Sequence, residues 1–217
     1  MRTTRWFIGG LVYAASLSAT ASAQQSRYFD DSWFWGVKSG VATFSPTLGG
    51  NETAATFGGE WLITRTRGGL YVSFDQANVS TTSAVVDANS TDKVRPVSVD
   101  KLRRIGAAAL AFPKRFGRFR PYAGLGLSID LVGDASPLVG AQGDSVDAAV
   151  FDRIEERRSQ AGVLGMAGVQ MQFERLALFA QASVVPAQSN FLLGNNVLGF
   201  FEGGVRYNFG GSREGSR

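Results

Sequence analysis

The feature that most constrains this chain is a strict alternation of residue types from Tyr122 to Leu131. The odd-numbered positions carry alanine, leucine and isoleucine, and the even-numbered positions carry tyrosine, glycine, serine and aspartate. Successive side chains of a β-strand point to opposite faces. The segment is therefore predicted to be a strand with one apolar face and one small or polar face.

The same period of two recurs along the chain and predicts eight strands. They lie at about Trp33–Phe44, Phe57–Thr64, Leu70–Asp75, Val97–Phe112, Pro121–Val132, Val163–Phe173, Leu178–Val184 and Phe201–Phe209. In Val97–Phe112 a run of three alanines interrupts the alternation, so the sequence does not show which positions of that strand face inward. Arg104 and Gly106 therefore lie either on the polar face of that strand or on its apolar face.

The connections between these strands alternate in length. Gln76–Arg95 and Gly133–Arg158 are long, Ser45–Glu52 and Val185–Asn196 are moderate, and Arg65–Gly69, Pro113–Arg120 and Glu174–Arg175 are short. Long loops at one end and short turns at the other are typical of an up-and-down outer membrane barrel. Val146–Arg158 has the composition of a short helix, but we predict a mobile loop segment there, without a role of its own.

Leu176–Phe201 has no charged residue over 26 positions, which is long enough for a membrane-spanning helix. Pro186 and several glutamines, asparagines and glycines argue against that helix. Two strands around a polar loop explain the segment better.

Two kinds of closed barrel fit the alternation. A soluble barrel of the lipocalin kind keeps its apolar face inside, whereas a membrane barrel turns that face to lipid. The polar faces here carry glycine and isolated charges, not the many lysines and glutamates of a wetted exterior. The predicted fold class is all-β, a closed eight-stranded antiparallel up-and-down transmembrane β-barrel.

Charged residues on the inner faces are predicted to form a lumen charge network. They are Lys38, Glu60, Asp130, Glu202 and Arg206. An eight-stranded barrel has an interior that side chains fill, and a charge buried there needs a partner. We expect ion pairs across the lumen, with Arg103 or Arg104 joining if that strand faces inward. The charges either serve a function or only neutralise one another inside the barrel, and the sequence is the same in both cases.

Aromatic residues flank the expected short turns. Trp33, Trp35, Tyr122, Phe173, Tyr207 and Phe209 are predicted to form an aromatic girdle at that end, together with Phe112 and Phe179. In a closed barrel the first and last strands are neighbours, so Trp35 should lie near Tyr207. The alternative is a set of ordinary core aromatics, because aromatic residues favour strands in any case.

Residues 1–23 have the layout of a secretory signal peptide. Two arginines precede an apolar stretch from Trp6 to Leu17, and Ala21-Ser22-Ala23 has the form of a cleavage site. The alternative, an anchor helix, is disfavoured because the apolar stretch is too short to span a bilayer. We expect a mature barrel over residues 24–209 and a flexible C-terminal tail over residues 210–217.

The 217 residues include no cysteine and no histidine. Their absence excludes disulfides, thiol catalysis, catalytic triads with histidine and the usual zinc sites. Without the two arginines of the signal peptide, 20 basic residues face 18 acidic ones, so the charge gives no reason to expect a nucleic acid partner. We expect neither an enzyme nor a cofactor.

Three segments resemble the OmpA-like family of eight-stranded outer membrane β-barrels. They are Gly36–Gly40 in the first strand, Arg120–Gly126 entering the fifth, and Gly204–Phe209 in the last. The resemblance covers essentially the whole mature chain and implies architecture, not activity. It implies the bacterial outer membrane as the location, with outer membrane lipid and, during biogenesis, the barrel insertion machinery as partners. The chain departs from the family in continuing beyond Phe209, and we do not expect the peptidoglycan-binding role of the larger family members.

These features lead us to expect a structural or surface-interaction role, exercised through the long external loops on a partner that the sequence does not identify. The lumen is expected to be filled by side chains. The alternative is a small passive channel for small or apolar solutes, as in OmpW-like barrels. A soluble lipocalin-like binding barrel is the weaker alternative.

Overall fold

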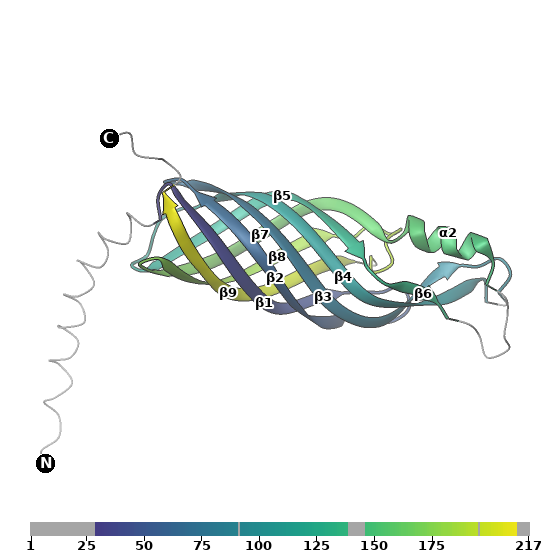
Figure 1. Ribbon diagram of the computed structural model, residues 1–217. Coiled ribbons are helices and arrows are strands. Elements are labelled where there is room, and N and C mark those ends of the chain that lie inside the picture. The colour runs from purple at the N-terminus through teal and green to yellow at the C-terminus, as the bar shows by residue number, and fades with distance from the viewer. Residues whose placement is uncertain (1–28, 91, 139–145, 195, 212–217) are drawn as a thin grey trace, which may run out of the picture.

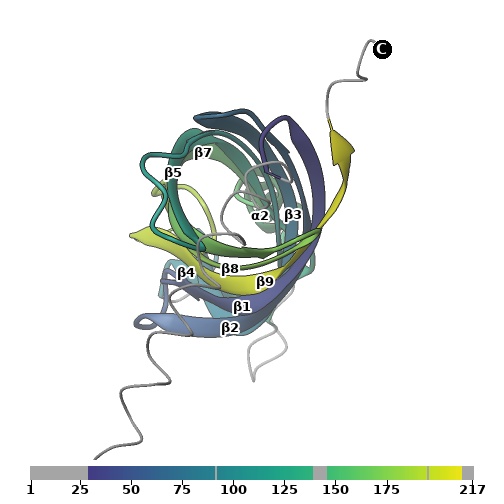
Figure 2. The ribbon, with the colours of Figure 1, turned by 90° about the vertical axis from the view of Figure 1, so that its left-hand side faces the viewer.

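The computed structural model describes residues 29–90, 92–138, 146–194 and 196–211, which form a closed antiparallel barrel (Figure 1). The barrel strands are β1 (Ser32–Phe44), β2 (Glu52–Thr64), β3 (Gly68–Val86), β4 (Val94–Ala111), β5 (Phe119–Val132), β7 (Ser159–Phe173), β8 (Leu176–Pro186) and β9 (Val197–Gly211). Because β1 pairs with both β2 and β9, the sheet closes into a ring of strands (Figure 2). The predicted eight-stranded fold is confirmed.

Part of the sequence prediction falls outside this description. The predicted signal peptide, residues 1–23, and residues 212–217 of the predicted tail lie outside the described residues. The first two tail residues, Gly210 and Gly211, belong to β9.

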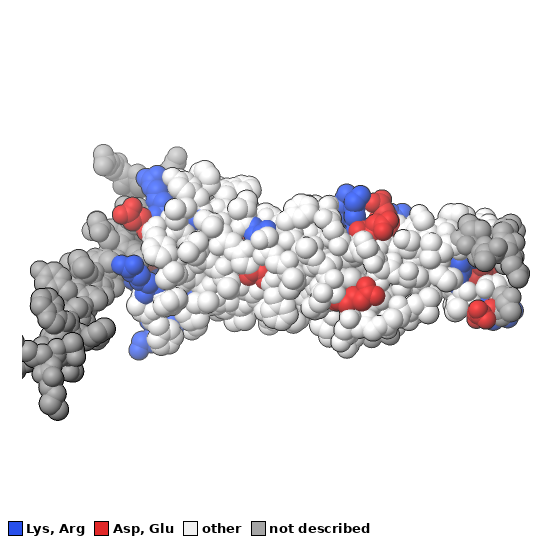
Figure 3. Space-filling model, turned by 90° about the horizontal axis from the view of Figure 1, so that it is seen from below, with Lys and Arg blue, Asp and Glu red and all other residues white. Residues whose placement is uncertain are grey.

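The faces of the strands are arranged as expected for a membrane barrel. Leu125 and Leu127 are 70% and 68% exposed on the outer wall, whereas Asp130 on the same strand is fully buried. In β4, Arg104 is buried and Ile105 is exposed, which settles the parity that the alanine run hid. Figure 3 shows an outer wall that is mostly free of charge, with basic groups gathered at the end of the short turns.

The short turns and the long connections lie at opposite ends of the barrel. The β2–β3, β4–β5 and β7–β8 turns share the end at which β1 begins and β9 finishes. In membrane barrels of this type the short turns are periplasmic. We therefore call this the periplasmic end.

The hairpin of β3 and β4 continues well beyond the barrel. β2 leaves β3 at Ala77 and β5 leaves β4 at Leu102, but β3 and β4 stay paired as far as Val86 and Val94. The prediction of a loop over Gln76–Arg95 is therefore wrong for most of that segment. Its serines and threonines are polar enough to suggest a loop, but threonine, like valine, fits a strand well when a partner strand is present.

The connection between β5 and β7 contains two further elements. β6 (Ala135–Pro137) pairs with β4, and α2 (Ala148–Glu156) follows it. The prediction of a mobile segment over Val146–Arg158 is wrong, because Val150 and Ile154 lie four residues apart on one helical face and are both buried. No helix in the described parts of the chain combines the length and the hydropathy that a membrane-spanning helix requires.

Candidate functional site

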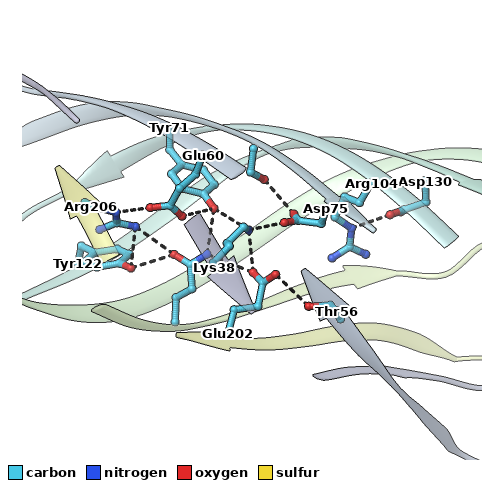
Figure 4. Close-up of polar contacts among 12 residues, drawn as sticks. Lys38, Thr56, Glu60, Tyr71, Asp75, Arg104, Tyr122, Asp130, Glu202 and Arg206 are labelled. Carbon is cyan, nitrogen blue, oxygen red and sulfur yellow. Dashed lines mark hydrogen bonds and ion pairs between the residues drawn. The ribbon is translucent and has the colours of Figure 1, made fainter. Parts of the chain in front are cut away.

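The centre of the barrel holds a cluster of charged side chains around Lys38 (Figure 4). The Lys38 ammonium lies 2.8 Å from Asp75 Oδ1 and 2.8 Å from Glu202 Oε2, and it donates to the Tyr71 hydroxyl at 3.0 Å. Both ion pairs are almost completely buried. One ammonium thus has three oxygens around it, which matches the number of its donors.

A second ion pair, Glu60–Arg206, lies beside the first on its periplasmic side. Arg206 Nε donates to Glu60 Oε1, and the Tyr71 hydroxyl donates to Glu60 Oε2 at 3.0 Å. Tyr71 therefore links the two ion pairs, because it also accepts from Lys38. The remaining guanidinium nitrogens donate to Gln170 Oε1 at 2.8 Å, Tyr122 Oη at 3.3 Å and Gln181 Oε1 at 3.3 Å.

Glycines on the inner face make room for these side chains. In the sheet register, Gly36 stands between Glu60 and Arg206, and Lys38 stands between two other glycines. A Cβ at Gly36 would lie 3.0 Å from the Cγ atoms of both Glu60 and Arg206. The two charged side chains meet across the space that glycine leaves, so the glycine–charge alternation of β1 builds the network.

A third ion pair joins β4 to β5 on the side of the long loops. Arg104 Nε donates to Asp130 Oδ1 at 2.6 Å, while Gln160 and Ser128 donate to the other carboxylate oxygen at 3.1 and 3.4 Å. The guanidinium lies 3.9 Å from the centre of the Phe200 ring. Its two terminal nitrogens have no hydrogen-bond partner among the described residues. The ring face is their stabilising contact.

Apolar side chains close the lumen on both sides of the polar network. At the periplasmic end, the Phe29 ring packs edge-to-face on Phe112 with centroids 4.8 Å apart. The Arg120 guanidinium lies 3.5 Å from the centre of the Phe29 ring. At the other end, the β8–β9 connection folds into the mouth. Its fully buried apolar side chains are Phe191, Leu192 and Leu193. Among the described residues, buried apolar side chains thus lie on both sides of the polar network.

The charged side chains in this lumen neutralise one another in ion pairs. The described residues contain no group of three or more histidine, cysteine, aspartate or glutamate side chains placed to hold a metal ion. Glu60, Asp75, Asp130 and Glu202 each contact a cationic side chain. These carboxylates are therefore engaged with their partners. Two of the pairs join neighbouring strands, and the other two, Glu60–Arg206 and Asp75–Lys38, reach across an intervening strand.

The structure brings together four of the five residues predicted to form the lumen network. Lys38, Glu60, Glu202 and Arg206 share contacts through Tyr71 and Gln181. Asp130 belongs to the separate pair with Arg104, whereas Arg103 points outward and donates to Gln76. The prediction omitted Tyr71, Asp75, Gln170 and Gln181. In the strand predicted over Leu70–Asp75, Tyr71 and Asp75 alternate with leucine, valine and phenylalanine, so a signal for their inward position was present in the sequence.

Five of the six residues predicted for the aromatic girdle are exposed on the outer wall: Trp33, Trp35, Phe173, Tyr207 and Phe209. Trp35 pairs with Tyr207 in the register of β1 and β9, as expected. The prediction is wrong for Tyr122, which is buried in the lumen and donates to Gln181 at 2.9 Å. Phe112 and Phe179 are buried as well. All three stand in alternation with the outward-facing residues, on the same face as the polar inner residues. The face of the strand, and not closeness to a turn, therefore decides whether an aromatic side chain points outward.

Comparison with known proteins identifies the architecture. No protein-family model and no curated protein matches the chain. Among solved structures, Neisserial surface protein A (NspA) is similar with a TM-score of 0.55 and 18% identity, over 82% of this chain and 97% of that one. Ail, the attachment invasion locus protein of Yersinia pestis, is similar with a TM-score of 0.51 and 13% identity, over 83% of this chain and 100% of that one. The chain has the fold of the small outer membrane β-barrels. The predicted OmpA-like architecture is confirmed, and identities this low show the fold alone.

Proposed function

We propose that the chain is an integral protein of the bacterial outer membrane whose closed barrel anchors an external interaction module. The module, here named the outer extension, consists of residues 79–99 of the β3–β4 hairpin, β6 and α2. The observation that carries the proposal is the contrast between the two halves of the molecule. Buried charged and apolar side chains occupy the barrel interior. The β3–β4 hairpin and α2, by contrast, extend beyond the barrel (Figure 1).

The outer extension is held by buried apolar side chains. Val85, Val97, Val150 and Ile154 are almost fully buried, and they belong to the apolar cluster that continues into the barrel. Arg153 on α2 donates to the Val86 carbonyl at 2.5 Å, which joins the helix to the hairpin. Ordering a segment of this length costs conformational entropy, which the buried contacts offset. The extension therefore presents a defined surface instead of an ensemble of loops.

An ion pair fixes the tip of the hairpin. Arg95 Nε donates to Asp87 Oδ2 at 2.6 Å, and the Asn89 backbone N–H donates to Asp87 Oδ1 at 2.9 Å. The hydrogen bond from Arg95 holds the pKa of Asp87 below its ordinary value. Asp87 is thus ionised and paired with Arg95 at neutral pH.

The outer wall supports outer membrane lipid as the surroundings of the barrel. Large apolar side chains such as Leu125, Leu127 and Val37 are more than two-thirds exposed, and a continuous apolar surface of this kind is typical of contact with lipid. The predicted signal peptide supports export from the cytoplasm. The barrel fold supports the barrel insertion machinery as a transient partner during biogenesis.

Migration of unheated and boiled samples in SDS gels, after membrane fractionation, tests this placement. A folded barrel that resists detergent should migrate differently before boiling and should fractionate with the outer membrane. Recovery of the protein as a soluble periplasmic species would contradict the placement.

A passive channel is the competing function. It requires a continuous polar path, but apolar layers lie on both sides of the ion pairs in the lumen. We therefore expect no stable conductance steps when the purified, folded protein is inserted into planar lipid bilayers. Reproducible steps from heat-modifiable protein would contradict the filled lumen and favour the channel.

The name of one structural neighbour, the attachment invasion locus protein, suggests attachment as the first interaction to test. Bacteria that display the full chain should attach to epithelial cell layers, or to one another, more strongly than cells with an empty vector. A trimmed variant, with residues 82–98 replaced by Asn-Gly between the paired Thr81 and Val99, should lose that gain. Unchanged attachment by a trimmed but heat-modifiable barrel would contradict a role for the outer extension.

A further inference from the structure

A shallow apolar groove crosses the outer wall of the barrel. Its volume is about 790 Å³, and its outward-facing lining residues include Ala109, Ala111, Ala123, Gly165, Ala167 and Ala182. A second hollow of about 480 Å³ shares Ala167 and Ala182 with the first and continues to Gly203 on β9. Together the two hollows form one depression across β4, β5, β7, β8 and β9. We name this depression the wall groove.

The wall groove is lined mostly by small side chains. Alanine and glycine supply most of its outward-facing residues, and the larger exposed side chains in its lining include Leu125 on β5, Val169 on β7 and Val184 on β8. Five neighbouring strands span roughly 19 Å at their usual spacing. The hydrocarbon region of one leaflet is about 15 Å thick. The groove is thus long enough to hold one extended acyl chain.

The wall groove begins at the periplasmic end and climbs toward the middle of the membrane. Ala111, at one end of the groove, is the last residue of β4. Ala182, farther along, lies well inside β8, which starts at Leu176. Because the strands of such barrels are tilted by about 35–45°, a path across them rises through the leaflet. A lipid chain in the groove therefore has its headgroup at the periplasmic surface, below β4.

A basic turn lies at that lower end of the groove. The β4–β5 turn carries Lys114, Arg115 and Arg118 without any acidic residue, and Lys114 and Arg118 are exposed. Over the described part of the periplasmic end, seven basic side chains (Arg65, Arg67, Lys114, Arg115, Arg118, Arg120, Arg175) accompany three acidic ones (Asp30, Asp31, Glu174). Asp30 and Asp31 are already paired with Arg120 and Arg65. Figure 3 shows basic groups gathered at this end.

We propose that the wall groove and the basic turn bind one anionic phospholipid of the periplasmic leaflet. One acyl chain lies in the wall groove, and the phosphate lies near Lys114 and Arg118. Charge decides between this occupant and a second copy of the chain, because a second copy would bring a like-charged turn toward the first, whereas an anionic headgroup is attracted. The inference rests on the proposed membrane placement and not on the proposed attachment role.

The test uses the full, folded protein in nanodiscs of equal parts phosphatidylglycerol and phosphatidylcholine with identical acyl chains. After extraction into mild detergent, native mass spectrometry counts the lipids that stay bound. The wild type should retain one phosphatidylglycerol in preference to phosphatidylcholine by about thirtyfold, the contribution of two basic side chains. Lys114→Gln/Arg118→Gln should lose that preference. Ala123→Phe/Ala167→Phe fills the groove and should lose retention of both lipids.

Two matched controls separate the site from general effects. Arg65→Gln/Arg67→Gln removes the same charge from the β2–β3 turn, and Ala55→Phe adds the same ring to an exposed position of β2 outside the groove. Both should retain lipid as the wild type does. Gel migration before and after boiling checks that every variant is folded.

Three results would overturn the lipid site. They are equal retention of the two lipids by the wild type, unchanged retention in the groove-filling variant, and a lipid-free dimer that the groove-filling variant alone abolishes. The last of these would make a second copy the occupant. A protein that does not insert into the nanodiscs at all would instead overturn the membrane placement, so the two failures are distinguishable.

Discussion

Replacing Lys38 with methionine tests whether the charges in the lumen form a dry, coupled network. The substitution keeps an unbranched side chain but removes the ammonium that lies 2.8 Å from both Asp75 and Glu202. The carboxylates would keep only neutral donors such as Ser73, at 3.1 Å from Asp75. Removing one partner of a buried ion pair costs about 3–5 kcal/mol. Because one ammonium serves two buried carboxylates here, we expect a loss in the upper part of that range.

A second substitution isolates the coupling. Adding Glu202→Gln to Lys38→Met removes one of the stranded charges, so the double variant should be more stable than the single one. With Glu202→Gln alone completing the double-mutant cycle, the interaction free energy between the two positions should be at least about 1 kcal/mol. Val37→Met is the matched control, because it places the same side chain on the neighbouring lipid-facing position, which is 69% exposed. That control should change the free energy of unfolding by less than about 0.5 kcal/mol.

The measurement is urea unfolding in detergent micelles, followed by the folded fraction on unheated gels and extrapolated linearly to water. A loss below about 1 kcal/mol for Lys38→Met would refute the reasoning, since it would mean that water solvates the charges. A double variant less stable than Lys38→Met alone would refute it as well. If the single variant does not fold, recovery of folding in the double variant demonstrates the same coupling.

Three further perturbations have definite expected outcomes. Phe200→Leu removes the ring beneath the Arg104 guanidinium and should lower the free energy of unfolding by about 2 kcal/mol in the same urea assay. Gly126→Ala should cost about 1–3 kcal/mol there, because its Cβ would lie 2.0 Å from a backbone oxygen of β4. Because Arg95 lowers the folded-state pKa of Asp87, their contact stabilises the hairpin tip above about pH 3.9, the ordinary aspartate value, and the stabilisation is lost as pH falls through the folded pKa. The protection of the tip amides from hydrogen exchange, relative to their intrinsic rates at each pH, should therefore fall in acid, and Asp87→Asn should remove most of that fall.

The sequence alone predicted the eight barrel strands and, except in β4, the face of each strand that points outward. A side-chain period of two is a local property of an extended backbone, so the alternation around Leu125 and Leu127 required no knowledge of neighbouring strands. Isolated charges among glycines, such as Lys38 in β1, indicated a filled interior and hence an outer wall of apolar residues. The same parity identified Tyr71 and Asp75 as inward-facing, although the predicted network left them out.

The partners inside the barrel were decided only by the tertiary structure. Asp130 faces the lumen as predicted, but the register of β4 and β5 pairs it with Arg104 and not with Lys38. The outer extension likewise depends on non-local pairing, because Thr81–Val86 form a strand against Val94–Val99 and give α2 a surface on which to bury Val150. Parity is set residue by residue along one strand, whereas register and pairing depend on contacts summed over the whole closed sheet. No single segment of the sequence contains that sum.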